Sequence, residues 1–150
     1  MPVDESFTGR SYPPSAPYEV GREKIREFAR AIGDPHPAYT DPEEARRRGH
    51  PDVVAPPTFV FAVAFEAAGA VIHDPDLGLD YSRVVHGGQR FAYTRPVRAG
   101  DVLTVTSTIE TAGTARGNDI LEVRGEVHDA SGAHVVTAWT TLISRAPDDG

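Results

Sequence analysis

Three side chains that can exchange protons lie close together between Ala31 and Tyr39. The segment reads Ala-Ile-Gly-Asp-Pro-His-Pro-Ala-Tyr and contains the carboxylate of Asp34, the imidazole of His36 and the phenol of Tyr39. A carboxylate paired with a second titratable group can move protons on a bound substrate. The phenol is a poor base at neutral pH, because its ordinary pKa is about 10. The segment therefore has the outline of an acid/base loop in which Asp34 lacks a suitable partner.

Each of these candidates also has a purely structural interpretation. Asp34 stands between a glycine and a proline, where it is at least as readily a residue of the turn that ends a helix. His36 could be proposed as a replacement base, but one position on a loop rarely substitutes for another. His50 and His73 fall in turn-like segments, so we expect both at the surface.

Helical periodicity predicts the elements around this loop. Apolar residues at helical spacing between residues 25 and 32 predict an amphipathic helix that ends at Gly33. Asp41-Pro42-Glu43-Glu44 is typical of a helix start, and this second helix would run through three arginines and stop at Gly49. The segment Thr58–Ile72 is apolar nearly all round, so we expect a helix that is buried on every side.

Four strand-like runs follow, over residues 84–95, 101–111, 120–129 and 134–145. Their alternation of apolar and polar residues indicates a sheet with one buried face. Hairpin connections are expected at Ala112-Gly113 with Gly117-Asn118-Asp119, and at Asp129-Ala130-Ser131-Gly132. The economical packing is an α+β fold, in which a curved antiparallel sheet wraps around the apolar helix. An uncovered sheet edge would pair with that of a second molecule, so we predict a dimer.

Composition narrows the classes of function. The chain has 150 residues, which suits one domain spanning residues 1–150. Its net charge of −7 argues against a nucleic-acid partner. It has no cysteine, which excludes disulfides and favours the cytoplasm. No signal peptide is visible, and the apolar run from Phe59 is interrupted by Glu66 and too short for a bilayer, so no membrane insertion is expected. No acidic or histidine cluster has metal-ligand spacing, and we expect neither metal nor cofactor.

Three blocks of sequence together carry a family resemblance. They are Tyr18 to Ala29, Ala55-Pro56-Pro57-Thr58-Phe59, and His86-Gly87-Gly88-Gln89-Arg90-Phe91 running on to Asp101. With them the chain resembles the hot-dog fold of the MaoC-like dehydratases, which are related to (R)-specific enoyl-CoA hydratase 2. It looks closest to the HadA/HadC-type subunits of actinobacterial (3R)-hydroxyacyl-ACP dehydratases. The resemblance covers nearly the full length of the chain.

Two departures from the family pattern affect the same site. The catalytic loop of the family reads Gly-Asp-x-Asn-Pro-aliphatic-His, and here Tyr39 stands at the histidine position while Asp34 is retained. The family also has a His-Gly pair before the helix, whose glycine N–H binds the thioester oxygen. That pair becomes Pro56-Pro57, and proline has no N–H to donate. The oxyanion donor would be absent unless Thr58 or Phe59 supplies it.

The resemblance implies a subunit that is not self-sufficient. It would pair with a HadB-like subunit carrying the intact Asp/His dyad, and act on acyl-ACP or acyl-CoA. Asp34 would remain from a degenerate catalytic site, and the residues expected to line the substrate channel are Pro57, Thr58, Phe59, Phe61, Phe65, His86 and Gln89. His86 is equally well explained as a buried histidine with a satisfied hydrogen bond. Two rivals stay open: a homodimeric hydratase that uses Asp34 with His36 or His86, and an acyl-thioester binding module without catalysis.

Overall fold

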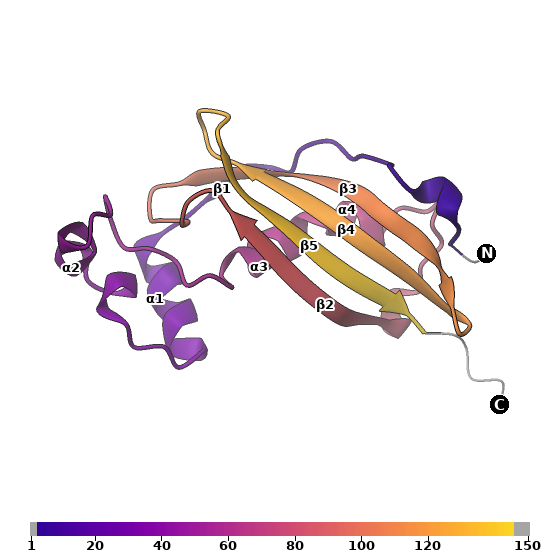
Figure 1. Ribbon diagram of the computed structural model, residues 1–150, viewed down its shortest axis with the longest axis horizontal. Coiled ribbons are helices and arrows are strands. Elements are labelled where there is room, and N and C mark those ends of the chain that lie inside the picture. Colours follow the sequence, from indigo (N-terminus) through magenta and orange to yellow (C-terminus); the bar gives the residue numbers. More distant parts are fainter. Residues whose placement is uncertain (1–2, 146–150) are drawn as a thin grey trace.

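A curled antiparallel sheet with one helix lying across its face dominates the computed structural model, which describes residues 3–145 (Figure 1). The strands are β1 (Tyr18–Glu19), β2 (Val84–Tyr93), β3 (Val102–Ala115), β4 (Asn118–His128) and β5 (His134–Ser144). Their order across the sheet is β1-β3-β4-β5-β2, and every pairing is antiparallel. The predicted α+β arrangement of a curved sheet around a helix is confirmed.

The strand predictions were correct to within a few residues, and one predicted turn was correct only at Gly117. Ala112 and Gly113 lie inside β3, paired with Leu121 and Ile120 of β4. The hairpin turn lies further on, at Arg116 and Gly117, which both have positive φ angles of 55° and 79°. Two successive left-handed residues give the tight connection that suits the right-handed twist of paired strands.

The apolar segment forms two helices rather than one, α3 (Val60–Ala67) and α4 (Gly69–Ile72). Its predicted burial on every side is also wrong for this chain. Val60, Val63 and Ala64 are buried against the sheet, whereas Ala62 and Glu66 are exposed. A single sheet covers only one side of a helix, and the composition of the helix cannot show what covers the other side.

The helices α1 (Arg22–Ala31) and α2 (Pro42–Arg47) lie together at the end of the sheet away from the termini (Figure 1). The helix α1 is followed by Gly33 with a φ of 72°, as predicted for its end. In α2, Asp41 caps the first turn by accepting a hydrogen bond from the Glu43 N–H at 3.0 Å. Single turns of 3-10 helix occur at Glu5–Phe7, Pro37–Tyr39 and Tyr81–Arg83.

The core lies between α3 and the concave face of the sheet. Leu103, Val105 and Ile109 of β3 face the core in alternation, as the sequence pattern predicted. Gly125 allows the helix to approach closely: a Cβ added there would lie 3.2 Å from Val105 Cγ1 and 3.8 Å from Ala64 Cβ.

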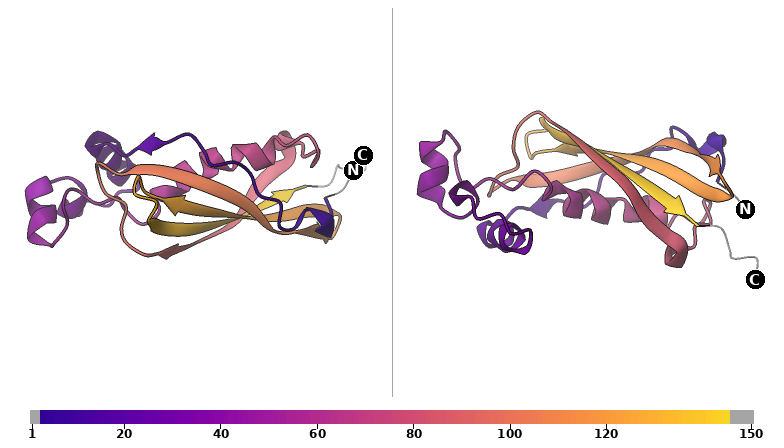
Figure 2. Two further views of the ribbon diagram at one scale, coloured as in Figure 1. Left: turned by 90° about the horizontal axis from the view of Figure 1, so that it is seen from above. Right: turned by 60° about the horizontal axis from the view of Figure 1, so that its bottom comes forward.

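The two edges of the sheet differ. Residues 9–15 run beside β3, where Tyr12 N–H donates to Ser107 O at 2.9 Å and Ser15 N–H donates to Val105 O at 2.9 Å. This segment and β1 cover the β3 edge. The other edge is β2, which has β5 on one side and no strand on the other among residues 3–145 (Figure 2).

Candidate functional site

A cavity of about 530 Å³ opens beside β2, between the start of α3 and the side of α1. It brings together four residues that the sequence predicted as channel lining, with two aromatic residues that it did not. The lining residues are Phe28, Thr58, Phe61, His86, Gln89 and Phe91. The sequence pattern could have indicated both of the unpredicted residues. Phe28 lies on the apolar face of α1, and Phe91 lies two residues after Gln89, which places both side chains on the same face of the strand.

The polar side of this cavity is a short hydrogen-bonded chain. The hydroxyl of Thr140, a buried residue of β5, donates to Gln89 Oε1 at 2.9 Å. His86 Nε2 lies 3.1 Å from the same oxygen. The His86 ring meets Phe61 edge to face, with centroids 5.2 Å apart. The imidazole of His86 therefore contacts an amide oxygen on one side and an aromatic ring on the other, and it is exposed, so the alternative of a buried histidine is wrong.

The other predicted channel residues are placed differently. Phe65 stacks on Phe61 with ring centroids 5.3 Å apart, which extends the aromatic wall along α3. Phe59 is 1% exposed and packs in the core against Phe28. Pro57 lines a separate depression of about 290 Å³, where its carbonyl oxygen accepts a hydrogen bond from the Tyr93 hydroxyl.

Asp34 lies in the turn that ends α1. The Asp34 N–H donates to Ala29 O at 3.0 Å, and the Gly33 N–H donates to Arg30 O at 3.1 Å, which is the bonding pattern of a Schellman end. The Asp34 carboxylate accepts from the His36 N–H at 3.2 Å. It lines a depression of about 400 Å³ that shares no lining residue with the aromatic cavity.

Neither neighbour of Asp34 replaces the missing histidine. His36 Nδ1 accepts the Ala38 N–H at 3.1 Å and so caps the following turn. Burial raises the pKa of Tyr39, and the negative charge of Asp34 raises it further. The phenol is therefore neutral at neutral pH, and the fraction present as the phenolate that could accept a proton is smaller than in a free tyrosine.

One backbone donor is available just before α3. The Phe59 N–H is used internally, donating to Pro56 O at 2.9 Å. The Thr58 N–H has no acceptor within the described part of the chain. Since the Thr58 residue lines the aromatic cavity, this N–H is the remaining candidate for an oxyanion donor.

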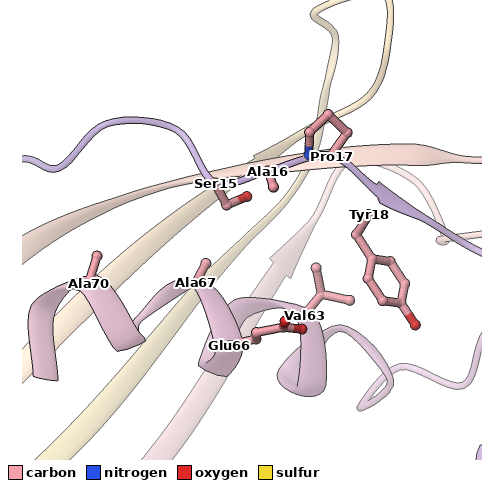
Figure 3. Close-up of a pocket in the computed structure, with 8 residues that line it drawn as sticks. All are labelled: Ser15, Ala16, Pro17, Tyr18, Val63, Glu66, Ala67 and Ala70. Carbon is pink, nitrogen blue, oxygen red and sulfur yellow. The ribbon is translucent and has the colours of Figure 1, made fainter. Parts of the chain in front are cut away.

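A further groove of about 310 Å³ runs between the N-terminal segment and α3 (Figure 3). Ala67 and Ala70 face Ser15–Pro17 across it, and Glu66 and Tyr18 lie at one end. None of the predicted site residues lines this groove.

No group of three or more histidine, aspartate or glutamate side chains within residues 3–145 is arranged to hold a metal ion. None of the helices in that range has both the length and the apolar character that a bilayer crossing requires.

Sequence comparison identifies the family. The family model for the FAS1-like dehydratase domain region matches residues 6–138. The chain belongs to this family. A UPF0336 protein of Streptomyces coelicolor is 70% identical over 149 residues, which cover 99% of each chain.

Solved structures give the same assignment. A chain of the C-terminally truncated HadBC (3R-hydroxyacyl-ACP dehydratase) complex of Mycobacterium tuberculosis has a TM-score of 0.81 and 35% identity, over 91% of this chain and 96% of that one. A MaoC-like dehydratase has a TM-score of 0.87 and 31% identity, over 95% of this chain but 43% of that one. The predicted MaoC-like hot-dog dehydratase fold is confirmed.

Proposed function

We propose that this chain is the non-catalytic, substrate-channel subunit of a (3R)-hydroxyacyl-thioester dehydratase in fatty-acid metabolism. Its partner is a hot-dog subunit that carries the intact Asp/His dyad. Together the two subunits convert (3R)-hydroxyacyl thioesters of acyl-carrier protein or CoA into trans-2-enoyl thioesters in the cytoplasm. The proposal places this chain with the HadA/HadC-type subunits.

The separation of Asp34 from the aromatic cavity is the observation that carries the proposal. Dehydration removes a weakly acidic α-proton and expels a poor leaving group, so it needs a base and an acid at the same substrate. Asp34 is engaged in a helix end, and the neighbouring His36 and Tyr39 offer no free base. The aromatic cavity beside β2, by contrast, has the apolar walls and few polar groups of a site for an acyl thioester.

The free edge of β2 supports a partner of the same fold. The ten-residue strand β2 has no strand paired along one side within residues 3–145, and such an edge is a surface that proteins normally cover or pair. The aromatic cavity opens beside this strand, so a subunit paired with β2 would close it. The HadBC structure is itself a complex of two named subunits, which is consistent with such pairing.

The test is turnover of crotonyl-CoA by the purified chain, alone and with candidate dyad-bearing subunits. We expect no activity from the chain alone and activity on addition of the partner, which co-purification at native expression level would identify. Turnover by the chain alone that is abolished by Asp34→Asn would overturn the proposal and favour a self-sufficient hydratase. Binding of long-chain acyl-CoA with no activating partner would favour a binding module without catalysis.

A further inference from the structure

A hydroxyl, an imidazole and a carboxylate are joined in a row near the ends of β2, β4 and β5. The hydroxyl of Thr94, the residue after β2, lies 2.7 Å from His134 Nδ1. On the other side of the ring, His134 Nε2 lies 3.3 Å from Glu126 Oε2 of β4. A nucleophile, a base and a group that orients the base follow each other in this order in hydrolases that form an acyl-enzyme, and the order is recognised by geometry rather than by sequence position.

The carboxylate side of this row offers two acceptors to the ring. Thr137 donates its hydroxyl hydrogen to Glu126 Oε2 at 2.7 Å, so the Thr137 oxygen can accept from His134 Nε2, which lies 2.8 Å away. The other oxygen of Glu126 lies 3.3 Å from Arg124 Nε, which keeps the carboxylate paired. A carboxylate only accepts hydrogen bonds, so this side favours a ring hydrogen on Nε2. In that tautomer Nδ1 accepts the hydrogen of the Thr94 hydroxyl, as a general base must.

The nucleophilic end of the row lies at a depression in the surface. Thr94 is exposed, and it lines the depression of about 290 Å³ whose other walls include Ala55, Pro57 and Pro96. These apolar walls can hold a small apolar group of a substrate beside the hydroxyl. The depression shares no lining residue with the aromatic cavity beside β2, so the row belongs to a separate site.

The backbone around Thr94 restricts the substrates that this site can take. The Thr94 N–H donates to Val135 O at 2.8 Å, and the Arg95 N–H donates to the same oxygen at 3.3 Å. Both amides are therefore already engaged and do not serve as oxyanion donors next to the hydroxyl. An acyl group on a good leaving group, such as a phenol, needs the least stabilisation of this kind. The site thus suits activated aryl esters rather than amides or alkyl esters.

We propose that Thr94, His134 and Glu126 form a second site, which hydrolyses activated acyl esters through an acyl-threonine intermediate. Thr94 Oγ1 attacks the carbonyl carbon of the ester while His134 Nδ1 takes the hydroxyl proton. The bond from that carbon to the leaving oxygen breaks, and the alcohol departs with the proton. Water then attacks the acyl-threonine with His134 again as the base, which releases the carboxylic acid and restores the Thr94 hydroxyl. Glu126 orients the ring and stabilises its protonated form.

The first test is labelling of the full chain by an alkyl fluorophosphonate, in which an activated hydroxyl displaces fluoride from phosphorus and the proton leaves with the fluoride. We expect an adduct on Thr94, located by peptide mass spectrometry, in the wild type and in Thr94→Ser but not in Thr94→Val. His134→Gln and Glu126→Gln should slow the labelling by about 10²-fold or more. Thr111→Val, which replaces an exposed threonine of β3, is the matched control and should be labelled on Thr94 as fast as the wild type.

Hydrolysis of 4-nitrophenyl acetate provides the second test. We expect the wild type to release 4-nitrophenol in an initial burst and to carry an acetyl group on Thr94, which mass spectrometry detects after acid quenching. Thr94→Val should show neither. Because Thr94 is exposed, its two variants keep the test valid where a change at His134 destabilises the fold. An unlabelled Thr94 in the wild type, or equal labelling of Thr94 in the wild type and in folded His134→Gln, overturns the proposal.

Discussion

Tyr39 and Asp34 show how much the chemistry of a loop depends on the type of a single side chain. The backbone of this loop keeps the glycine, aspartate and proline of the family motif, and its helix end is regular. An imidazole at position 39 could accept a proton at neutral pH, whereas a phenol whose pKa is raised by burial and by Asp34 cannot. Under the proposed function, the loop keeps its fold while the acid/base chemistry belongs to the partner subunit.

A substitution of either residue should leave the assembled enzyme active. In the complex with a dyad-bearing partner, we expect Asp34→Asn and Tyr39→Phe to keep turnover within about threefold of the wild type, whereas losing a working acid/base group costs about 10²–10⁴-fold. As the control, changing the aspartate of the partner's dyad to asparagine should reduce turnover by the larger factor. A similarly large loss from Asp34→Asn would mean that this loop takes part in catalysis.

Asp129 provides a prediction about pH. The Ser131 hydroxyl, followed by the Arg95 guanidinium, holds the pKa of the Asp129 carboxyl well below its usual range. A carboxylate whose pKa is lower in the folded state stabilises the fold above its unfolded pKa of about 3.9. That contribution is lost as the pH falls through the folded value.

We therefore expect Asp129→Asn to lower the urea midpoint of unfolding at pH 7. The gap between variant and wild type should narrow as the pH falls below about 4, because the unfolded wild-type chain then binds a proton at Asp129 that the folded chain does not yet bind. Urea titrations between pH 7 and pH 3 measure this gap. A gap of constant size over that range would show that the charge of Asp129 does not stabilise the fold.

At the scale of elements, the packing of α3 on the sheet depends on a missing side chain. Gly125 of β4 faces the helix, and a Cβ there would press on Val105 and touch Ala64. The sequence pattern predicted β4 by its alternation, but it could not show that this position lies directly under the helix. That fact depends on how the helix crosses the sheet, which no local pattern records.

Gly125→Val should destabilise the fold by about 1–3 kcal/mol, because added carbon atoms in a packed core force shifts in neighbouring groups. Gly113→Val is the matched control: it is also a strand glycine, and a Cβ there meets nothing within 4 Å. Chemical denaturation of both variants measures the difference. Equal losses would indicate that the cost comes from valine in a strand rather than from the helix contact.

For the whole molecule, local features were more predictable than the relations between distant segments. Strands, helix ends and the α+β class follow from periodicity and capping residues, which are local. One channel was predicted to be lined by Thr58, Phe61, His86 and Gln89. The fold brings these four residues to one cavity. Nothing in the local pattern indicates that Asp34 lies in a different depression, since the end of α1 is placed by packing rather than by its own residues.

The free β2 edge gives a prediction at this scale. Val85 lies on this strand and is 42% exposed, and a lysine on an edge strand opposes pairing with another chain. We expect Val85→Lys to weaken association at least about tenfold in analytical ultracentrifugation, while the thermal midpoint of the subunit itself stays nearly unchanged. Thr106→Lys, on the strand β3 whose edge is covered by residues 9–15, should leave association intact. Unchanged association of Val85→Lys would place the partner elsewhere.

The segment of residues 9–15 that lies along β3 limits what this molecule can build. A curled sheet with two open sides could add copies end over end and grow into a filament. Because the β3 edge is occupied by the subunit's own residues 9–15, each subunit has only the β2 edge left for pairing with another subunit. Association through sheet edges therefore ends at a dimer. Removing residues 9–15 would expose the β3 edge and allow further subunits to add.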